Sequence, residues 1–256
     1  GFTMLEITSA QNPRIASLRA LRQAKGRAEA GLFLAEGRKL CQEAFDYAQV
    51  ETLLVDRERA EEYAALIARA KDVLAVPARI LETVCETKTP QGVLASVRIP
   101  APPELSQLDG LLLVLDGVQD PGNVGTMLRT AEAAGFSGAL LSPACADAFA
   151  PKTVRATMGS VYRVPVWRGE LAVALCALKE RGFTVVSSEL GGDDFFAALP
   201  ELSAPLALVV GSEGNGVAAP VRALATRRLT LPMGGRVESM NAAVAAAILM
   251  YSIGHR

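Results

Sequence analysis

The chain has 256 residues, half of them hydrophobic, and a formal net charge of −1 at pH 7. This length accommodates two modest domains or one large one, and the apolar fraction provides a substantial core. A net charge near zero gives no overall attraction to a polyanion, so a nucleic-acid surface would have to be a local basic patch.

The cysteine and histidine content excludes several kinds of chemistry. The four cysteines are far apart in sequence: Cys41, Cys85, Cys145 and Cys176. They form no Cys-x-x-Cys metal or redox motif and are expected to be reduced core residues of a cytoplasmic protein. His255 is the only histidine, which excludes a His-centred triad and a multi-His metal site. No secretory signal is recognisable at the start, and the apolar run 240–253 is too short to span a bilayer.

A proline-rich stretch divides the chain. "PAPPELSQLD" (100–109) has three prolines within four positions, which disfavours both a helix and a central strand. We therefore expect a linker between a first domain, 1–99, and a second domain, 110–256. Both have ordinary domain sizes.

The first domain opens with a basic segment before Gly31, in which Arg14, Arg19, Arg22, Lys25 and Arg27 outweigh Glu6. Short buried strands are predicted at 51–56, 72–77 and 92–99. The segment 57–71 is charged and rich in alanine, as expected of a helix. This alternation predicts an α/β domain.

The second domain shows the α/β pattern more clearly. "LLLVLD" (111–116) is a continuous apolar run, which is typical of a strand in a parallel sheet. Further strands are predicted at 138–142, 163–167, 183–188, 206–210 and 228–232. Helices are predicted at about 124–134, 151–159, 170–181 and 239–253. Periodicity alone predicts an ordinary doubly wound sheet.

The first loop with chemical potential follows Asp116 in "DGVQDPGNVGTMLRTAEAAG". Asn123 is a plausible N-cap whose helix would direct backbone N–H groups at the loop. Two interpretations of Arg129 stand open. It could form a surface pair with Glu132, worth about 0.3–0.5 kcal/mol, or face a charged substrate.

The second loop is "GSEGNG" (211–216), which follows an apolar run. Its glycine order differs from the Rossmann fingerprint, and Val217 stands where a P-loop requires lysine. The carboxylate of Glu213 would repel a phosphate. A plain strand–helix turn and a pocket for another ligand both remain open.

The third loop precedes the last helix in "LPMGGRVESMNAAVAAAILMYSI" (231–253). Ser239 or Asn241 could cap that helix and need no other role. All three Gly-rich loops follow apolar strands, however, and the carboxyl ends of strands are where α/β proteins bind ligands. We therefore expect the three loops to build one site.

Together, "NVGTMLRTAEAAG", "GSEGNG" and "LPMGGRVESMNAAVAAAI" resemble the SpoU, or TrmH-like, branch of the SPOUT RNA 2′-O-ribose methyltransferases. The resemblance covers 111–253, including "APKTVRATMGSVYRVPV". Met240, where leucine is usual, and Thr157, where serine is common, are conservative departures. "QNPRIASLRAL", "GLFLAEGRKL" and "TPQGVLASV" look like the small ribosomal-protein-like α/β domain that many members use to bind RNA.

The resemblance implies a fold that periodicity does not predict. A parallel-sheet domain would end in a deep trefoil knot, a topology that general rules count as nearly absent. It also implies a homodimer that binds S-adenosylmethionine and methylates a ribose 2′-OH of rRNA or tRNA. The additional N-terminal domain favours large-subunit rRNA, by analogy.

The resemblance also implies roles for individual residues. The catalytic set would be Asn123, Arg129, Glu213, Ser239 and Asn241. The cofactor would be held at Gly211, Gly216, Leu231, Pro232 and Met240, largely through backbone groups. RNA would be captured by Arg14, Arg19, Arg22, Lys25, Arg27 and Arg38, with Lys39 nearby.

The proton of the hydroxyl needs an acceptor, and no histidine stands in these motifs. Because a guanidinium stays protonated in proteins, Arg129 is better suited to binding a phosphate and stabilising the developing alkoxide. Glu213 or a water could receive the proton. Two rival functions are an RNA-binding protein without catalysis and a nicotinamide-dependent oxidoreductase. The complete residue set opposes the first, and the glycine pattern opposes the second.

Overall fold

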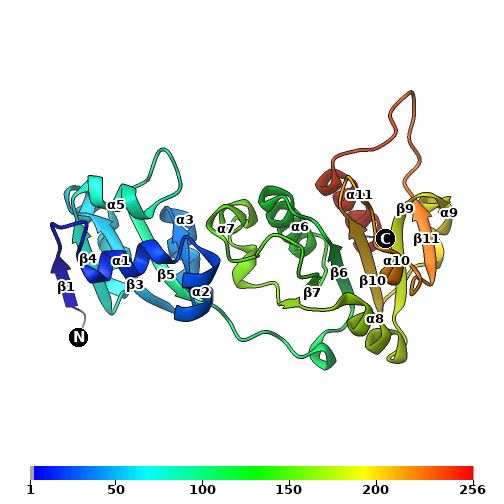
Figure 1. The fold of residues 1–256 in the computed structure, drawn as a ribbon, viewed down its shortest axis with the longest axis horizontal. Coiled ribbons are helices and arrows are strands. Elements are labelled where there is room, and N and C mark those ends of the chain that lie inside the picture. Colours follow the sequence, from blue (N-terminus) through cyan, green and yellow to red (C-terminus); the bar gives the residue numbers. More distant parts are fainter. Residues whose placement is uncertain (1–2, 256) are drawn as a thin grey trace. The chain divides into compact units, whose positions relative to one another are not determined.

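The computed structural model describes residues 3–255, which divide into two compact units (Figure 1). The first unit comprises the chain through Ala101 together with Asp147–Arg163. The second comprises Pro102–Ala146 and the chain from Val164 onward. The segment 147–163, which we expected within the second domain, thus belongs to the first compact unit.

The first unit contains a five-stranded sheet in the order β1-β4-β3-β5-β2. Its strands are β1 (Thr3–Glu6), β2 (Leu32–Glu36), β3 (Val50–Asp56), β4 (Asp72–Val76) and β5 (Val93–Arg98). The helices are α1 (Pro13–Ala20), α2 (Ala24–Ala30), α3 (Arg38–Tyr47), α4 (Ala64–Arg69) and α5 (Ala78–Val84). β1, β4 and β3 run parallel, whereas β5 is antiparallel to β3 and β2.

Both faces of this sheet are buried. Successive side chains of each strand point to opposite faces, and each set packs in its own apolar cluster. Phe33, Leu53 and Val73 pack in one cluster with residues of α3 and α4. Their neighbours Leu34, Leu54 and Leu74 pack in another cluster with residues of α1 and α5. Strands that are buried on both faces read as continuous apolar runs, which is how β3 and β4 were recognised in the sequence.

The segment 147–163 forms α7 (Pro151–Thr157) and the 3-10 helix η3 (Ser160–Tyr162). Ion pairs fix it within the first unit. Arg27 is 4% exposed and donates to Asp147 at 3.0 Å, and Arg155 lies 2.9 Å from the buried carboxylate of Glu36. The hydroxyl of Tyr162 donates to the carbonyl of Leu40 at 2.9 Å.

The second unit contains a six-stranded, entirely parallel sheet in the order β11-β9-β10-β6-β7-β8. Its strands are β6 (Leu111–Asp116), β7 (Gly138–Leu141), β8 (Val166–Arg168), β9 (Thr184–Asp194), β10 (Leu206–Gly211) and β11 (Arg227–Thr230). The helices are α6 (Pro121–Ala133), α8 (Leu171–Glu180), α9 (Phe195–Ala198), α10 (Ala219–Arg222) and α11 (Ala242–Gly254). This arrangement confirms the predicted parallel α/β sheet.

Helix α11 packs closely against α6 in the second unit. A Cβ atom at Gly254 would lie 1.9 Å from the carbonyl oxygen of Ala134, so the two backbones touch there. Ala243 and Ala246 of α11 are also buried. The alanine-rich sequence of the last helix therefore permits close helix packing, as expected.

Three details of the sequence prediction were wrong. Residues 57–71 form a 3-10 helix, η1 (Arg57–Tyr63), followed by the short α4, and not one continuous helix. β1, β2 and the helices around them were not predicted. β9 continues six residues beyond its predicted end at residue 188, through a polar, Gly-containing stretch that offers no apolar signal.

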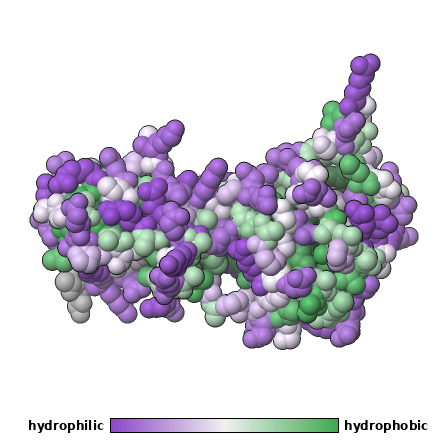
Figure 2. Space-filling view, in the orientation of Figure 1, coloured by the Kyte–Doolittle hydropathy of each residue, from purple (hydrophilic) through white to green (hydrophobic). Residues whose placement is uncertain are grey.

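The loop between β11 and α11 extends away from the rest of its unit (Figure 1), and its tip is hydrophilic (Figure 2). Residues 234–239 are all exposed, including Val237 at 58%. Residues 3–255 include no helix whose length and apolar content would let it traverse a bilayer.

Three cysteines, Cys41, Cys85 and Cys145, are buried and free, whereas Cys176 is exposed, contrary to expectation. Burial raises the pKa of the Cys85 thiol to about 12 and raises the pKa of Cys41 as well. These two thiols are therefore protonated at neutral pH and suited to packing.

Candidate active site

The three predicted loops emerge from the same edge of the parallel sheet in the second unit. β6 and β10 pair in register, with Gly211 opposite Asp116 at their carboxyl ends. The carboxylate of Asp116 accepts a hydrogen bond from the backbone N–H of Ala218 at 2.7 Å. The first and second loops are thus joined directly at the sheet edge.

The first loop differs from the prediction at the start of its helix. We expected Asn123 to be the N-cap, but Asp120 holds that position and α6 begins at Pro121. Proline suits the first helical position because its φ is preset and it has no N–H to satisfy. Asp120 Oδ2 accepts the N–H of Asn123 at 2.8 Å, which leaves the Asn123 side chain free for another role.

The second loop closes on itself as a tight turn. Ser212 and Gly216 form an isolated antiparallel bridge, and the N–H of Gly216 donates to the Ser212 carbonyl at 2.9 Å. The N–H of Asn215 donates to Ser212 Oγ at 3.1 Å. A Cβ at Gly211 would lie 2.2 Å from the carbonyl carbon of Gly216, so a side chain at Gly211 would force the turn open.

The third loop ends at Asn241, which is the N-cap of α11, one of the two caps we considered. Its Oδ1 accepts the N–H groups of Ala243 and Val244 at 2.9 and 3.2 Å. Its Nδ2 donates to Asn123 Oδ1 at 3.3 Å. Glu213 Oε1 accepts the N–H of Ala242 at 2.8 Å. The start of α11 therefore binds both other loops.

A cavity of about 370 Å³ lies between the second and third loops and the end of β9. Six predicted residues line it: Gly211, Glu213, Gly216, Leu231, Ser239 and Met240. Pro232 and Arg129 are not among its lining residues. Asn123 and Asn241 do not line it either, but Asn241 directly follows the lining residue Met240.

Arg129 stands apart from these contacts. Its side chain is exposed on α6, and it has no hydrogen bond or ion pair among the residues that the structure describes. It lies six positions after Asn123 on the helix, a rise of about 9 Å along the axis. The guanidinium is therefore available to an external anion.

Glu189, Arg222 and Arg228 also line the cavity and were missed in the sequence. Both arginines form ion pairs with the Glu189 carboxylate. Glu189 directly follows the predicted strand 183–188. The rule that ligands bind at the carboxyl ends of strands could therefore have identified it.

The basic residues of the first unit have different environments. Arg14 pairs with Asp72, which lowers the pKa of that carboxyl group, and Arg38 pairs with Glu62 at 2.6 Å. Arg19 and Arg22 donate to the Thr83 side chain and carbonyl respectively, at 2.9 and 3.2 Å. Each of these four side chains keeps part of its surface accessible.

Lys25 and Arg27 differ strongly in the exposure of their side chains. The side chain of Lys25 is 87% exposed, whereas that of Arg27 is 5% exposed and donates to the Leu21 carbonyl and to Asp147. Arg27 therefore has a structural environment, and we remove it from the expected RNA surface.

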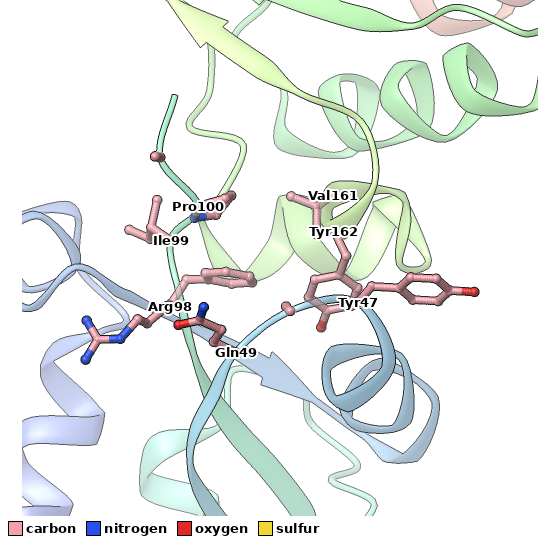
Figure 3. A pocket seen from close by; sticks show the side chains of 10 residues that line it. Tyr47, Gln49, Arg98, Ile99, Pro100, Val161 and Tyr162 are labelled. Carbon is pink, nitrogen blue, oxygen red and sulfur yellow. The ribbon is translucent and has the colours of Figure 1, made fainter. Parts of the chain in front are cut away.

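A second cavity, of about 340 Å³, lies within the first unit (Figure 3). It is lined by Phe33, Tyr47, Gln49, Ile99 and Tyr162, among others. None of the predicted catalytic, cofactor or RNA-binding residues lines it. The predicted site residues therefore favour the cavity of the second unit as the active site.

Comparisons with known proteins agree with this geometry. A model of the SpoU rRNA Methylase family matches residues 110–251, and one of the MRM3-like substrate binding domain matches residues 12–95. The 23S rRNA (guanosine(2553)-2′-O)-methyltransferase RlmP of Bacillus subtilis is 35% identical over 252 residues, covering 98% of this chain and 99% of RlmP. An uncharacterized tRNA/rRNA methyltransferase of Synechocystis, slr1673, is 31% identical over 96% of this chain and 92% of its own.

A solved structure extends the similarity to three dimensions. The AdoMet-bound rRNA methyltransferase of Sinorhizobium meliloti superposes with a TM-score of 0.87 at 34% identity, covering 98% of this chain and 97% of that one. The similarity thus includes both units and all three loops. The chain belongs to the SpoU rRNA methylase family.

Proposed function

We propose that this protein transfers a methyl group from S-adenosylmethionine to a ribose 2′-OH of large-subunit ribosomal RNA. One observation carries the proposal: the three motif loops, more than 100 residues apart at their extremes, are hydrogen-bonded to one another beside a single cavity. The full-length similarity to a 23S rRNA 2′-O-methyltransferase supports this RNA class.

The cavity has the properties that this cofactor requires. Its volume of about 370 Å³ lies within the range of small-molecule sites, about 300–1,000 Å³. Leu231 and Met240 provide apolar walls for an adenine ring, and the turn Gly211–Gly216 brings backbone close to the ligand. When bound, the cofactor supplies a methyl group on a positively charged sulfonium. The Glu213 carboxylate, unsuited to a phosphate, is a compatible neighbour for that charge.

Asn123 and Asn241 would orient the substrate ribose. Asn241 Oδ1 is used by the helix cap, and its Nδ2 by Asn123 Oδ1. This leaves the Nδ2 group of Asn123 as a donor whose direction is fixed. Positioning the hydroxyl about 3–3.5 Å from the methyl carbon is the main requirement of such a displacement. Ser239, in the cavity wall, would bind the same ribose.

Arg129 would bind a phosphate of the RNA next to the target ribose. Its exposed guanidinium offers the planar pair of donors that matches a phosphate, and it is not engaged by another described residue. Its fixed charge would also stabilise negative charge that develops on the ribose oxygen.

The hydroxyl proton would leave to Glu213 or to a water molecule. One oxygen of Glu213, which lines the cavity, accepts the Ala242 N–H, so the other oxygen remains as an acceptor. Glu213 would also position α11 against the second loop. Both roles depend on a carboxylate at this position.

The RNA would first contact the first unit. Arg14, Arg19, Arg22, Lys25 and Arg38 keep accessible cationic surface on it. Arg19 and Arg22 line a shallow surface hollow together with Ala16, Ala20 and Gln23. Phosphate contacts of this kind make affinity decrease as salt increases.

Family membership further suggests that the second unit is knotted and that the protein is a homodimer. Exposed Val244 and Tyr251, seven residues apart on α11, support an apolar partner surface. Sedimentation at micromolar concentration would give the mass of the dimer. Because ribosomal RNA is its proposed substrate, we infer that the protein acts in the cytoplasm.

The decisive experiment is mass spectrometry of rRNA and tRNA from a deletion strain. The expected result is the loss of one 2′-O-methyl nucleotide from 23S rRNA, restored by the wild-type gene. Loss from tRNA would support the alternative substrate suggested by the Synechocystis relative. Unchanged methylation of both RNAs, together with RNA binding by the purified protein, would support the catalytically silent alternative.

A further inference from the structure

An unusual irregularity of β9 lies against the proposed cofactor cavity. β9 and β11 pair in parallel, but the register jumps from Arg228 opposite Ser187 to Leu229 opposite Asp193. Residues 188–192 are therefore looped out from the pairing. Two hydrogen bonds to the Thr230 hydroxyl hold this loop. The hydroxyl donates to the Glu189 carbonyl at 2.7 Å and accepts the Gly192 N–H at 2.7 Å.

The looped-out segment carries a buried carboxylate into the cavity wall. The Glu189 side chain is 6% exposed, yet Glu189 lines the cavity. Arg222 Nε lies 2.5 Å from Oε1, and Arg228 Nε donates to Oε2 at 2.6 Å. Both arginines line the cavity too and keep about half of their side-chain surface exposed.

This arrangement pairs the buried carboxylate with two cations and leaves part of its hydrogen-bonding capacity unused. Two guanidinium groups offset the cost of burying the charge. Oε1 is buried and accepts no hydrogen bond of suitable geometry, despite its proximity to Arg222. Since each carboxylate oxygen has two acceptor positions, Glu189 can still accept from a ligand that offers hydroxyl or amine donors.

We propose that Glu189 recognises the ribose hydroxyls of S-adenosylmethionine, an inference that rests on the cofactor proposed above. Among the donors of that molecule, the 2′- and 3′-hydroxyls form an adjacent pair that matches the two oxygens of one carboxylate. An acidic residue binds the ribose in the same manner in dinucleotide-binding folds. Arg222 and Arg228 hold the carboxylate in place and are positioning residues.

The test measures binding by calorimetry with two probes, S-adenosylhomocysteine and its analogue that lacks both the 2′- and the 3′-hydroxyl of the ribose. Wild-type protein is expected to bind the analogue about tenfold to a hundredfold more weakly, the value of a hydrogen bond to a charged group. Glu189→Ala is expected to lose the same factor for S-adenosylhomocysteine. It should bind the analogue within about threefold of wild type, because the contact is already absent.

A matched control is the ion pair of Arg227, which directly precedes Arg228 on β11. Arg227 pairs with Glu201 at 2.7 Å outside the cavity, so Glu201→Ala removes an ion-pair carboxylate without touching the ligand. It is expected to bind both probes like wild type. Glu189→Gln, which keeps the size but not the charge, should fall between wild type and Glu189→Ala for S-adenosylhomocysteine.

Two results would overturn the inference. One is equal affinity of wild-type protein for the two probes. The other is an equal loss for both probes in Glu189→Ala, which would show that the carboxylate only holds the looped-out segment. If wild-type protein bound neither probe, the proposed cofactor itself would be refuted, and this result is distinct from the other two.

Discussion

Asn241 donates its side-chain amide to Oδ1 of Asn123 while its own Oδ1 caps the last helix. Only the oxygen of the amide can accept the backbone N–H groups of Ala243 and Val244, so the orientation of the Asn241 amide follows from the cap. That orientation in turn requires Asn123 to present its oxygen to Asn241. The helix cap thereby determines which group Asn123 would offer to the proposed substrate.

Asn241→Asp tests this relay, in which the helix cap fixes the Asn241 amide and the Asn241 amide fixes that of Asn123. The carboxylate can still cap the helix, so the free energy of unfolding should change by less than about 0.5 kcal/mol. It cannot donate, so Asn123 would have to turn its NH₂ group toward residue 241 and away from the substrate. We expect turnover to fall at least tenfold, with little change in cofactor affinity by calorimetry. Unchanged turnover would contradict the relay.

Asn123→Ala should likewise reduce turnover more than cofactor binding, because Asn123 does not line the cavity. Single-turnover methylation and calorimetry separate the two quantities. Asn215→Ala is the comparison, since that side chain lines the cavity but is not part of the relay. A loss of cofactor affinity in Asn123→Ala would show that its role was misassigned.

Gly211→Ala should abolish tight cofactor binding. The added Cβ would lie 2.2 Å from the Gly216 backbone, and backbone cannot move aside as a flexible side chain can. Gly214→Ala is a matched control three residues away, where a Cβ meets no atom within 4 Å. Thermal shift with S-adenosylhomocysteine should show a ligand-induced increase in Tm for Gly214→Ala and none for Gly211→Ala. Equal shifts in both variants would refute the role given to the turn.

Arg129→Lys should lower RNA affinity and turnover while leaving protein stability unchanged. A lysine keeps the charge but lacks the planar pair of donors that matches a phosphate. Since Arg129 is exposed and unpaired among the described residues, the change removes no structural contact. Filter binding across a salt series and single-turnover rates are the measurements. Near-normal values for both would exclude the planar-donor role.

Lys25 and Arg27 provide a paired test of the RNA surface. Lys25→Gln should weaken RNA binding and make it less salt-dependent, without changing stability. Arg27→Gln should instead lower the free energy of unfolding by about 1.5–3 kcal/mol, because it removes buried hydrogen bonds to a charged group. Urea titrations and binding isotherms of both variants check the contrast. Weaker RNA binding with unchanged stability in Arg27→Gln would mean that the burial of Arg27 does not determine its role.

The parallel sheet and the convergence of the three loops could be predicted from the sequence because they depend on local patterns. Continuous apolar runs marked β6 and β10, and glycines marked the loops that follow them. Asn241 was recognisable as a cap from its position before an alanine-rich helix. Glu213 was identified through the resemblance, whereas its bond to Ala242 was not foreseen.

The features that could not be predicted from the sequence depend mainly on contacts between distant segments. The helix α6 is capped by Asp120 and not by Asn123, and these two capping residues lie only three positions apart. Glu189 lies in a segment without periodicity, and its arginine partners are 33 and 39 residues away in sequence, at Arg222 and Arg228. The burial of Arg27 depends on Asp147, 120 residues further along the chain.

The hydrogen bond between Asn123 and Asn241 spans 118 residues, and it has a consequence for how the protein is made. During translation, the segment around Asn123 leaves the ribosome long before its partner has been synthesised. Pairings of such long sequence separation form late and slowly in folding. A nascent chain can therefore bury much of its core while the three motif loops are still unconnected. The three loops would be joined only after α11 has been synthesised and has docked against α6.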